Sequence, residues 1–144
     1  MSLYVIDASV AARFLLFEEL SDKAEHVLED FMDGKIELVA PRLLIYEVGN
    51  TLCKAFKQGF ISFEDAREKI SYFLRLQLNI IELRKGDYEE VLDWSIKNDV
   101  TYYDAIYLVV TKKVGGILLS ADNMLYEKVN KIIPALHLRY YRKA

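Results

Sequence analysis

The hydrophobic positions of the chain fall into short apolar segments that alternate with longer segments of helical spacing. The short segments predict strands at residues 3–6, 36–40, 79–83, 117–119 and 136–138. Continuous apolar runs such as residues 3–6 are typical of strands buried on both faces. Between the strands, apolar residues recur every three or four positions, as on one side of a helix. The alternation predicts a parallel sheet covered by helices on both faces.

Turn and capping residues mark where the predicted helices begin and end. We expect Ser9 to cap the first helix and Pro41 to open the third, because proline suits the first helical turn. Ser62–Asp65 and Thr101–Asp104 have the spacing of a capping box. The predicted helices cover residues 10–16, 21–34, 41–59, 62–74, 86–98, 101–115 and 120–129.

Composition supports an ordered α/β domain. Of the 144 residues, 53% are hydrophobic and 28% are charged, and six glycines and two prolines are too few for a disordered or collagen-like chain. No apolar run approaches the roughly 18 residues of a membrane span, and the first residues lack the basic region of a signal peptide. Cys53 is the single cysteine, which excludes an intramolecular disulfide and a cysteine-based zinc site. We therefore expect one domain over residues 1–144, located in the cytoplasm.

The net charge of −3 hides an uneven distribution. Residues 112–144 contain seven Lys or Arg against two acidic residues, whereas residues 1–111 are strongly acidic. A basic end on an acidic body can contact phosphates locally. A solvated helix face with a charged tail explains the same pattern, so the charge alone leaves both interpretations open.

Four acidic residues interrupt apolar surroundings: Asp7, Glu47, Asp104 and Asp122. Asp7 follows the first predicted strand and Asp122 follows the fourth, and ligands of parallel sheets bind outside the carboxyl ends of the strands. Taken singly, each acid is explained as a helix cap or an exposed helix residue. Together they would repel one another unless some were protonated or a cation neutralised them. Oxygen-only ligands favour Mg²⁺ or Mn²⁺, which assist phosphodiester hydrolysis.

The segments around these acids resemble a known family. Val5–Ser9, Tyr46–Asn50, Tyr103–Tyr107 and Leu119–Asp122, in this order and spacing, are similar to blocks of the PIN-domain ribonucleases, and most of all of the VapC-type toxins of prokaryotic toxin–antitoxin pairs. The resemblance extends from residue 3 to about residue 138. It implies a PIN-like three-layer α/β/α fold with a short parallel sheet, and a Mg²⁺- or Mn²⁺-dependent endoribonuclease.

The resemblance also implies roles for individual residues. The four acids would be the catalytic residues that hold the cation. Ser9 and Ser120 match small hydroxyl residues found beside the first and last acids, and Asn50 matches an asparagine that orients Glu47. One departure is visible at Asn123, since the family often has an acidic or basic residue soon after the fourth acid. Asp99 is a candidate substitute ligand, although a loop acid is the simpler interpretation.

By the same resemblance, the expected partners are RNA as substrate and a VapB-like antitoxin. The antitoxin tail would lie along the helix that carries Glu47 and deliver a basic side chain to the acids. We also expect a two-fold homodimer formed by an exposed aromatic patch, the alternative being a tyrosine-rich core. The patch residues would be Tyr46, Phe56, Phe60, Phe63, Tyr72, Phe73 and Tyr107.

Three arginines are weaker candidates for RNA binding. Arg13 would lie near the Asp7 end of the sheet, and Arg139 and Arg142 alternate with tyrosines in a pattern suited to single-stranded RNA. The alternative for the tail is a structural edge strand with a frayed terminus.

Three other functions agree less well with the sequence. A haloacid-dehalogenase-like phosphatase needs a second acid two residues after the first, where this chain has Ser9. A receiver-type phosphoacceptor domain needs an acidic pair at the first strand end, which is absent. A catalytically silent PIN-like scaffold that binds RNA or a protein partner would have no reason to keep four mutually repelling acids.

Overall fold

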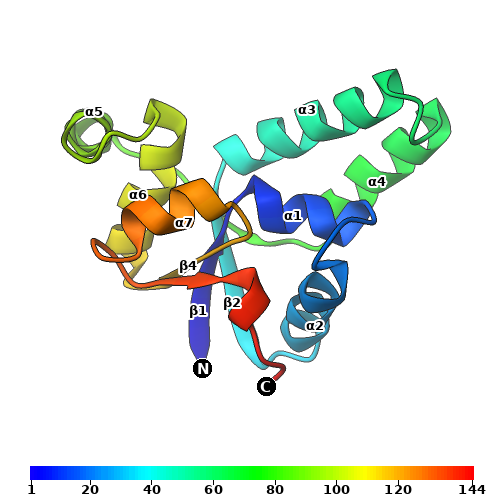
Figure 1. Cartoon of the computed structure of the whole chain (residues 1–144), viewed down its shortest axis with the longest axis horizontal. Helices are drawn as coiled ribbons and strands as arrows, with labels where there is room; N and C mark the ends of the chain where they lie inside the picture. The colour runs from blue at the N-terminus through cyan, green and yellow to red at the C-terminus, as the bar shows by residue number, and fades with distance from the viewer.

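All five strands run parallel in one sheet, with the spatial order β3-β2-β1-β4-β5. A computed structural model describes residues 1–144 (Figure 1). The strands are β1 (Ser2–Ile6), β2 (Ile36–Pro41), β3 (Asn79–Ile81), β4 (Ile117–Ser120) and β5 (Ala135–His137). The helices are α1 (Ala8–Leu15), α2 (Ser21–Met32), α3 (Leu43–Lys57), α4 (Phe63–Arg75), α5 (Lys85–Asn98), α6 (Tyr102–Val114) and α7 (Asn123–Val129), and a short 3₁₀ helix η1 (Leu138–Tyr140) follows β5. The predicted α/β class, the parallel sheet and the three-layer arrangement are confirmed.

The order of the strands separates the helices into two layers. The chain leaves β1 toward β2 and β3 and later returns to β4 on the other side of β1. Right-handed crossovers then place α1–α4 on one face and α5–α7 on the other, as Figure 1 shows for α1 and α2 against α6 and α7. The reversal of direction lies between β1 and β4, where open parallel sheets bind their ligands. The two strands pair directly, with Ile6 opposite Leu119.

The centre of the sheet and helix α6 form the core. Seven consecutive residues of α6, Ala105–Thr111, are buried, as expected for a helix that is apolar on all sides. Thr101 caps this helix by accepting a hydrogen bond from the Asp104 amide, and Gly115 ends it with φ +66°. The buried body of α6 therefore holds its first turn, which carries Asp104, at a fixed place over the sheet. None of the seven helices has the length and apolar character that crossing a membrane requires.

Two predicted helix starts are wrong. The cap of α1 is Asp7, whose carboxylate accepts from the Val10 amide, while Ser9 lies inside the helix. Pro41 does not open a helix but ends β2, paired opposite Ile81, and α3 begins two residues later. The pairing of β2 with β3 outweighs the local preference of proline for a first helical turn.

Candidate active site

Two of the four acids cap helices that start where neighbouring strands end. Asp7 follows β1 and caps α1, and Asp122 follows β4 and caps α7 through a 3.1 Å bond from the Leu125 amide. Because β1 and β4 are adjacent, both carboxylates lie at the same edge of the sheet, at the point where strand order reverses. The capping explanation considered for each residue alone is correct, and it also brings the two acids together.

Asp7 is enclosed by hydroxyl groups. Its side chain is only 5% exposed, Ser9 Oγ donates to one carboxylate oxygen at 2.5 Å, and Ser120 Oγ donates to the other at 2.5 Å. Burial raises the pKa of Asp7 to about 6, although these hydrogen bonds oppose the shift. The charge of Asp122 raises it further. Asp7 is therefore a carboxylate whose ionised form is costly in this site.

The two serines also hold the loop after β4. Ser9 Oγ accepts from the Ala121 amide at 2.8 Å, and Ser120 Oγ accepts from the Asp122 amide at 3.0 Å. Each hydroxyl thus donates to the Asp7 carboxylate after β1 and accepts from a backbone amide after β4, which connects the ends of the two strands. The arrangement orients Asp122 relative to Asp7.

Glu47 comes from a different layer and is held by a tyrosine. It lies in the second turn of α3, half-buried, and its carboxylate accepts a 2.5 Å hydrogen bond from the hydroxyl of Tyr107 on α6. Burial raises the pKa of Glu47, and the charge of Asp104 adds to the increase, while the bond from Tyr107 opposes it. The bond ties α3 to α6 across the carboxyl end of the sheet.

Electrostatic interactions link the four acids in sequence. Asp7 interacts with Asp122, Asp122 with Asp104, and Asp104 with Glu47. Burial, followed by the charge of Asp122, raises the pKa of Asp104. The four carboxylates are therefore near enough to influence one another in pairs along this series.

The site fits a divalent cation by its donor chemistry. Its ligating atoms are carboxylate and hydroxyl oxygens, the donors that Mg²⁺ and Mn²⁺ prefer. As the side chains stand, no three His, Cys, Asp or Glu residues converge closely enough to enclose an ion. The hydroxyl bonds orient the carboxylates of Asp7 and Glu47 and leave each carboxylate with further acceptor sites for a cation. Mg²⁺ commonly binds through only one or two carboxylates and keeps several waters, which suits this open arrangement.

Several sequence candidates lie outside this set. Asn50 is exposed, and no hydrogen bond joins it to Glu47, whose partner is Tyr107. Asp99 ends α5 in a left-handed conformation and pairs with Lys128, at the surface. Arg13 lies one turn beyond Ser9 on α1, where it donates to the Ser9 carbonyl at 2.7 Å.

The tail is partly structural. Tyr141 is buried, and its hydroxyl donates to the buried Asp30 of α2 at 2.6 Å. Arg139 and Arg142 on either side of it are exposed. An edge strand was expected over residues 136–138, and β5 occupies residues 135–137.

The expected aromatic patch is smaller than the sequence indicated. Tyr46, Phe56, Phe60 and Phe63 are exposed on or beside α3 and α4. Phe73 and Tyr107 are not part of the patch, because both side chains are buried in the core. Tyr72 is half-buried and packs against the same core.

Three residues of the site were missed by sequence reasoning. Tyr107 lies three residues after Asp104, a spacing that places both on one side of a helix, and this signal was available. Asn123 was noticed only as a departure from a family pattern. His137 is buried at the end of β5, opposite Ser120 on β4, a position that only the strand pairing reveals.

Known proteins match nearly the whole chain. The sequence profile of the family described as PIN domain matches residues 4–131. Ribonuclease VapC3 of Pyrobaculum aerophilum is 32% identical over 136 residues, which cover 90% of this chain and 96% of the relative. A protein named Exonuclease VapC9, from the same organism, is 29% identical over 130 residues, covering 90% of this chain and 88% of the relative.

Solved structures have the same fold. The crystal structure of PAE2754 from Pyrobaculum aerophilum has a TM-score of 0.72 and 25% identity, covering 96% of this chain and 85% of the other. VapBC2 from Rickettsia felis, bound to a DNA fragment from its promoter, has a TM-score of 0.67 at 14% identity, with 94% and 98% coverage. At 14% identity, the similarity to VapBC2 shows a shared fold and nothing more.

Proposed function

Because the chain belongs to the PIN-domain family, we propose that it is a VapC-type ribonuclease that hydrolyses RNA phosphodiester bonds with the help of Mg²⁺ or Mn²⁺. The observation that carries the proposal is the meeting of Asp7, Glu47, Asp104 and Asp122 at the strand-order reversal of the sheet. Burial and neighbouring carboxylates raise the pKa values of Asp7, Glu47 and Asp104, and shifts of this kind are typical of functional sites. The proposed active unit is a single domain over residues 1–144.

The four acids share one task in this proposal, and their hydroxyl neighbours have another. All four carboxylates would hold the cation, which when bound supplies activation of water and stabilisation of charge on the leaving oxygen. Ser9 and Ser120 keep Asp7 oriented, and Tyr107 keeps Glu47 oriented, as outer partners of metal ligands commonly do. Asp122 is exposed and would meet the incoming phosphate, whereas Glu47 and Asp104 are half-buried and Asp7 is buried.

The proposed mode of cleavage is endonucleolytic. The family resemblance favours an endoribonuclease, although one relative is named an exonuclease. In Figure 1 the carboxyl end of β1, where α1 begins, lies between the start of α3 on one side and α5 and α6 on the other. A covalently closed circular RNA, which has no end to attack, distinguishes the two modes because only an endonuclease cuts it.

An antitoxin is the proposed protein partner. A groove of about 420 Å³ lies between α3 and α4, and its apolar lining includes Leu52, Phe56, Phe63 and Ile70. Such a surface suits the apolar side of an amphipathic segment. A basic residue of that segment would reach Glu47 further along α3 and pair with the acids. Inhibition by the partner should then weaken as the Mg²⁺ concentration rises, and inhibition that ignores Mg²⁺ would contradict this competition.

The experiment that tests the proposed function compares two Asp→Asn exchanges. Asp104→Asn removes a charge from the site, whereas Asp99→Asn removes one from an exposed surface pair with Lys128. We expect the wild type and Asp99→Asn to cleave RNA with Mg²⁺ or Mn²⁺ and not with EDTA. Asp104→Asn should lose most of the activity while melting normally. Cleavage by Asp104→Asn at the wild-type rate would contradict the proposal.

A further inference from the structure

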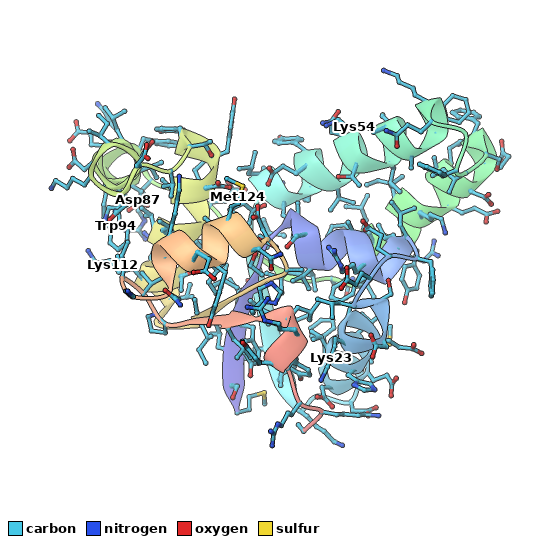
Figure 2. All side chains as sticks on the ribbon, in the orientation of Figure 1. Lys23, Lys54, Asp87, Trp94, Lys112 and Met124 are labelled. Atoms are coloured by element: carbon cyan, nitrogen blue, oxygen red, sulfur yellow. The ribbon has the colours of Figure 1, made fainter.

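Most basic residues near the C-terminus are already neutralised by acids. Lys112 pairs with Glu90 at 2.7 Å and lies over the Trp94 ring, and Lys113 pairs with Asp87; Figure 2 labels Lys112, Trp94 and Asp87 around α5 and α6. Lys128 and Lys143 also have carboxylate partners. Of the seven basic residues after position 111, the three that make no ion pair are Lys131, Arg139 and Arg142. The positive charge left for a ligand is therefore much smaller than the sequence indicates.

Arg139 is held in a defined position although no carboxylate binds it. Its Nη1 donates to Asn123 Oδ1 at 3.2 Å, and its guanidinium lies 4.9 Å from the centre of the Tyr140 ring. Asn123 follows Asp122 directly, so Arg139 is connected to the residue next to an acid of the active site. The side chain is exposed and keeps donors that can bind a further group.

Arg13 is the second cation at this end of the sheet without an ion pair. It donates from Nε to the Glu19 carbonyl and from Nη1 to the Ser9 carbonyl, both at 2.7 Å. Backbone carbonyls orient the guanidinium but leave its full charge uncompensated. Arg13 is thus fixed beside Ser9, which itself binds Asp7.

The buried ring of His137 contacts both Asn123 and the backbone of Arg139. Its Nδ1 accepts the Arg139 amide at 3.1 Å, so this nitrogen carries no proton and Nε2 donates to Asn123 Oδ1 at 2.7 Å. Tyr126 and Tyr140 pack edge-on against the ring. Arg13 is connected to the same region through Ser9, because the Ser9 hydroxyl lies 3.4 Å from the hydroxyl of Ser120, the residue opposite His137 in the β4–β5 pairing.

We propose that Arg13 and Arg139 form a subsite for a backbone phosphate of single-stranded RNA next to the phosphate that is cut, and that the His137–Asn123 pair positions Arg139 in it. This inference rests on the proposed ribonuclease function and specifies where its substrate binds. The planar guanidinium binds phosphate oxygens through two parallel hydrogen bonds, which suits a chain of phosphates better than a point charge does. The exposed Tyr140 ring beside Arg139 adds a surface on which a base can stack.

The subsite also gives Asn123 a role. An acid at this position would pair with Arg139 and cancel its charge, whereas the amide oxygen orients the guanidinium and leaves it positive. The Asn123 side-chain oxygen accepts hydrogen bonds from both His137 and Arg139, and it thereby connects the buried imidazole ring to the exposed guanidinium group. Asn123 and His137 are positioning residues in this scheme and do not touch the reacting atoms.

The test measures binding of a short fluorescein-labelled single-stranded RNA of mixed sequence as a function of salt. All proteins carry Asp104→Asn so that the RNA stays intact. The variants are Arg139→Gln, Arg13→Gln and Asn123→Ala, and the control is Arg75→Gln, an exposed arginine of α4 bonded only to Ser71. We expect Arg139→Gln and Arg13→Gln each to weaken binding roughly threefold to tenfold at low salt. Each should also reduce the slope of log K against log salt by about 0.7, the value for one single-strand phosphate contact. Arg75→Gln should leave the RNA affinity and its salt dependence unchanged.

Asn123→Ala separates positioning from stability. It should weaken RNA binding when Arg139 is present and have no further effect in the Arg139→Gln protein, because its influence passes through that guanidinium. A purely structural role would give equal losses in both backgrounds, and this result would overturn the positioning of Arg139 by Asn123. Unchanged affinity and salt slope in both arginine variants, with RNA still bound by the parent, would overturn the subsite alone. Failure of the parent to bind and of the wild type to cleave RNA would overturn the ribonuclease function, and the subsite with it.

Discussion

The hydroxyl of Tyr107 on α6 donates a 2.5 Å hydrogen bond to the carboxylate of Glu47 on α3, and so joins Glu47 to the helix of the other layer that carries Asp104. Tyr107 is 1% exposed, and the charges of Glu47, Asp7 and Asp104 all act on its hydroxyl. Burial is the main cause that raises the pKa of the Tyr107 hydroxyl, and these charges raise it further. The hydroxyl therefore stays protonated and remains a hydrogen-bond donor. The bond fixes the carboxylate of Glu47 without adding charge to an already acidic site.

Tyr107→Phe is predicted to disorder Glu47 while keeping the ring in the core. Activity and the affinity for Mn²⁺ should both fall by about tenfold, the usual lower bound for losing an outer partner of a metal ligand. Isothermal titration with Mn²⁺ gives a measurement independent of catalysis. The matched control is Tyr103→Phe on the same helix, whose side chain is 60% exposed and which should behave as wild type. Equal Mn²⁺ affinity in the two variants would contradict the role given to Tyr107.

Asp7→Asn is predicted to stabilise the protein when no divalent cation is present. The raised pKa of Asp7, about 6, means that the folded state binds the proton more tightly than the unfolded state does. The stability contribution is therefore fully present below the unfolded value of 3.8 and is lost as the pH rises through about 6. The loss amounts to about 3 kcal/mol for a shift of this size.

Urea unfolding in EDTA measures this effect at two pH values. Near neutral pH, Asp7→Asn should exceed the wild type in free energy of unfolding by about 1–3 kcal/mol, and below about pH 4 the difference should vanish. Asp99→Asn, at an exposed position, controls for the loss of one negative charge. A destabilised Asp7→Asn protein near neutral pH would show that the carboxylate is needed to hold the ends of β1 and β4 together.

Tyr141→Phe is predicted to destabilise the fold by about 1–3 kcal/mol, the cost of removing a partner from a buried polar group. The tyrosine hydroxyl and the Ala144 amide both donate to Oδ2 of Asp30, while Oδ1 of Asp30 is buried without a partner. Tyr140→Phe, on an exposed ring, is the control. Thermal or urea unfolding that shows equal stability of the two variants would contradict a structural role of the tail. Deleting residues 139–144 would mix this effect with the loss of Arg139, so the single exchanges are more informative.

A homodimer is predicted from the exposed aromatic side chains that remain after Phe73 and Tyr107 are assigned to the core. Tyr46 and Phe60 are exposed on or beside α3, outside the groove proposed for the antitoxin that Phe56 and Phe63 line, and exposed aromatic surface of this kind usually marks an interface. Sedimentation at micromolar concentration should give about twice the chain mass of 16.7 kDa. The variant Phe60→Ser should shift the protein toward the monomer, and a wild type that sediments as a monomer would contradict the prediction.

The acidic residues could be identified from the sequence because each stands alone in an apolar setting. The alternating strands and helices then placed Asp7 and Asp122 at one sheet edge, and the resemblance of four blocks implied one shared role for all four acids. Tyr107 could not be separated from surface aromatics by composition, since burial depends on how α6 packs against the sheet. The role of His137 depends on the pairing of β4 with β5, and Pro41 was misplaced because a long-range strand pair overrides a local preference.

The measurement that tests the central claim most directly is Mn²⁺ binding combined with cleavage of a circular single-stranded RNA. It is carried out on the wild type and on four single variants, Asp7→Asn, Glu47→Gln, Asp104→Asn and Asp122→Asn. If the four acids form one cation site for RNA hydrolysis, the wild type binds Mn²⁺ and cuts the circle. Each variant should then lose affinity for the ion and cleavage together while remaining folded. A variant that binds Mn²⁺ and cuts the circle as the wild type does would show that its acid lies outside the site, and a wild type that leaves the circle intact in Mn²⁺ would contradict the endoribonuclease itself.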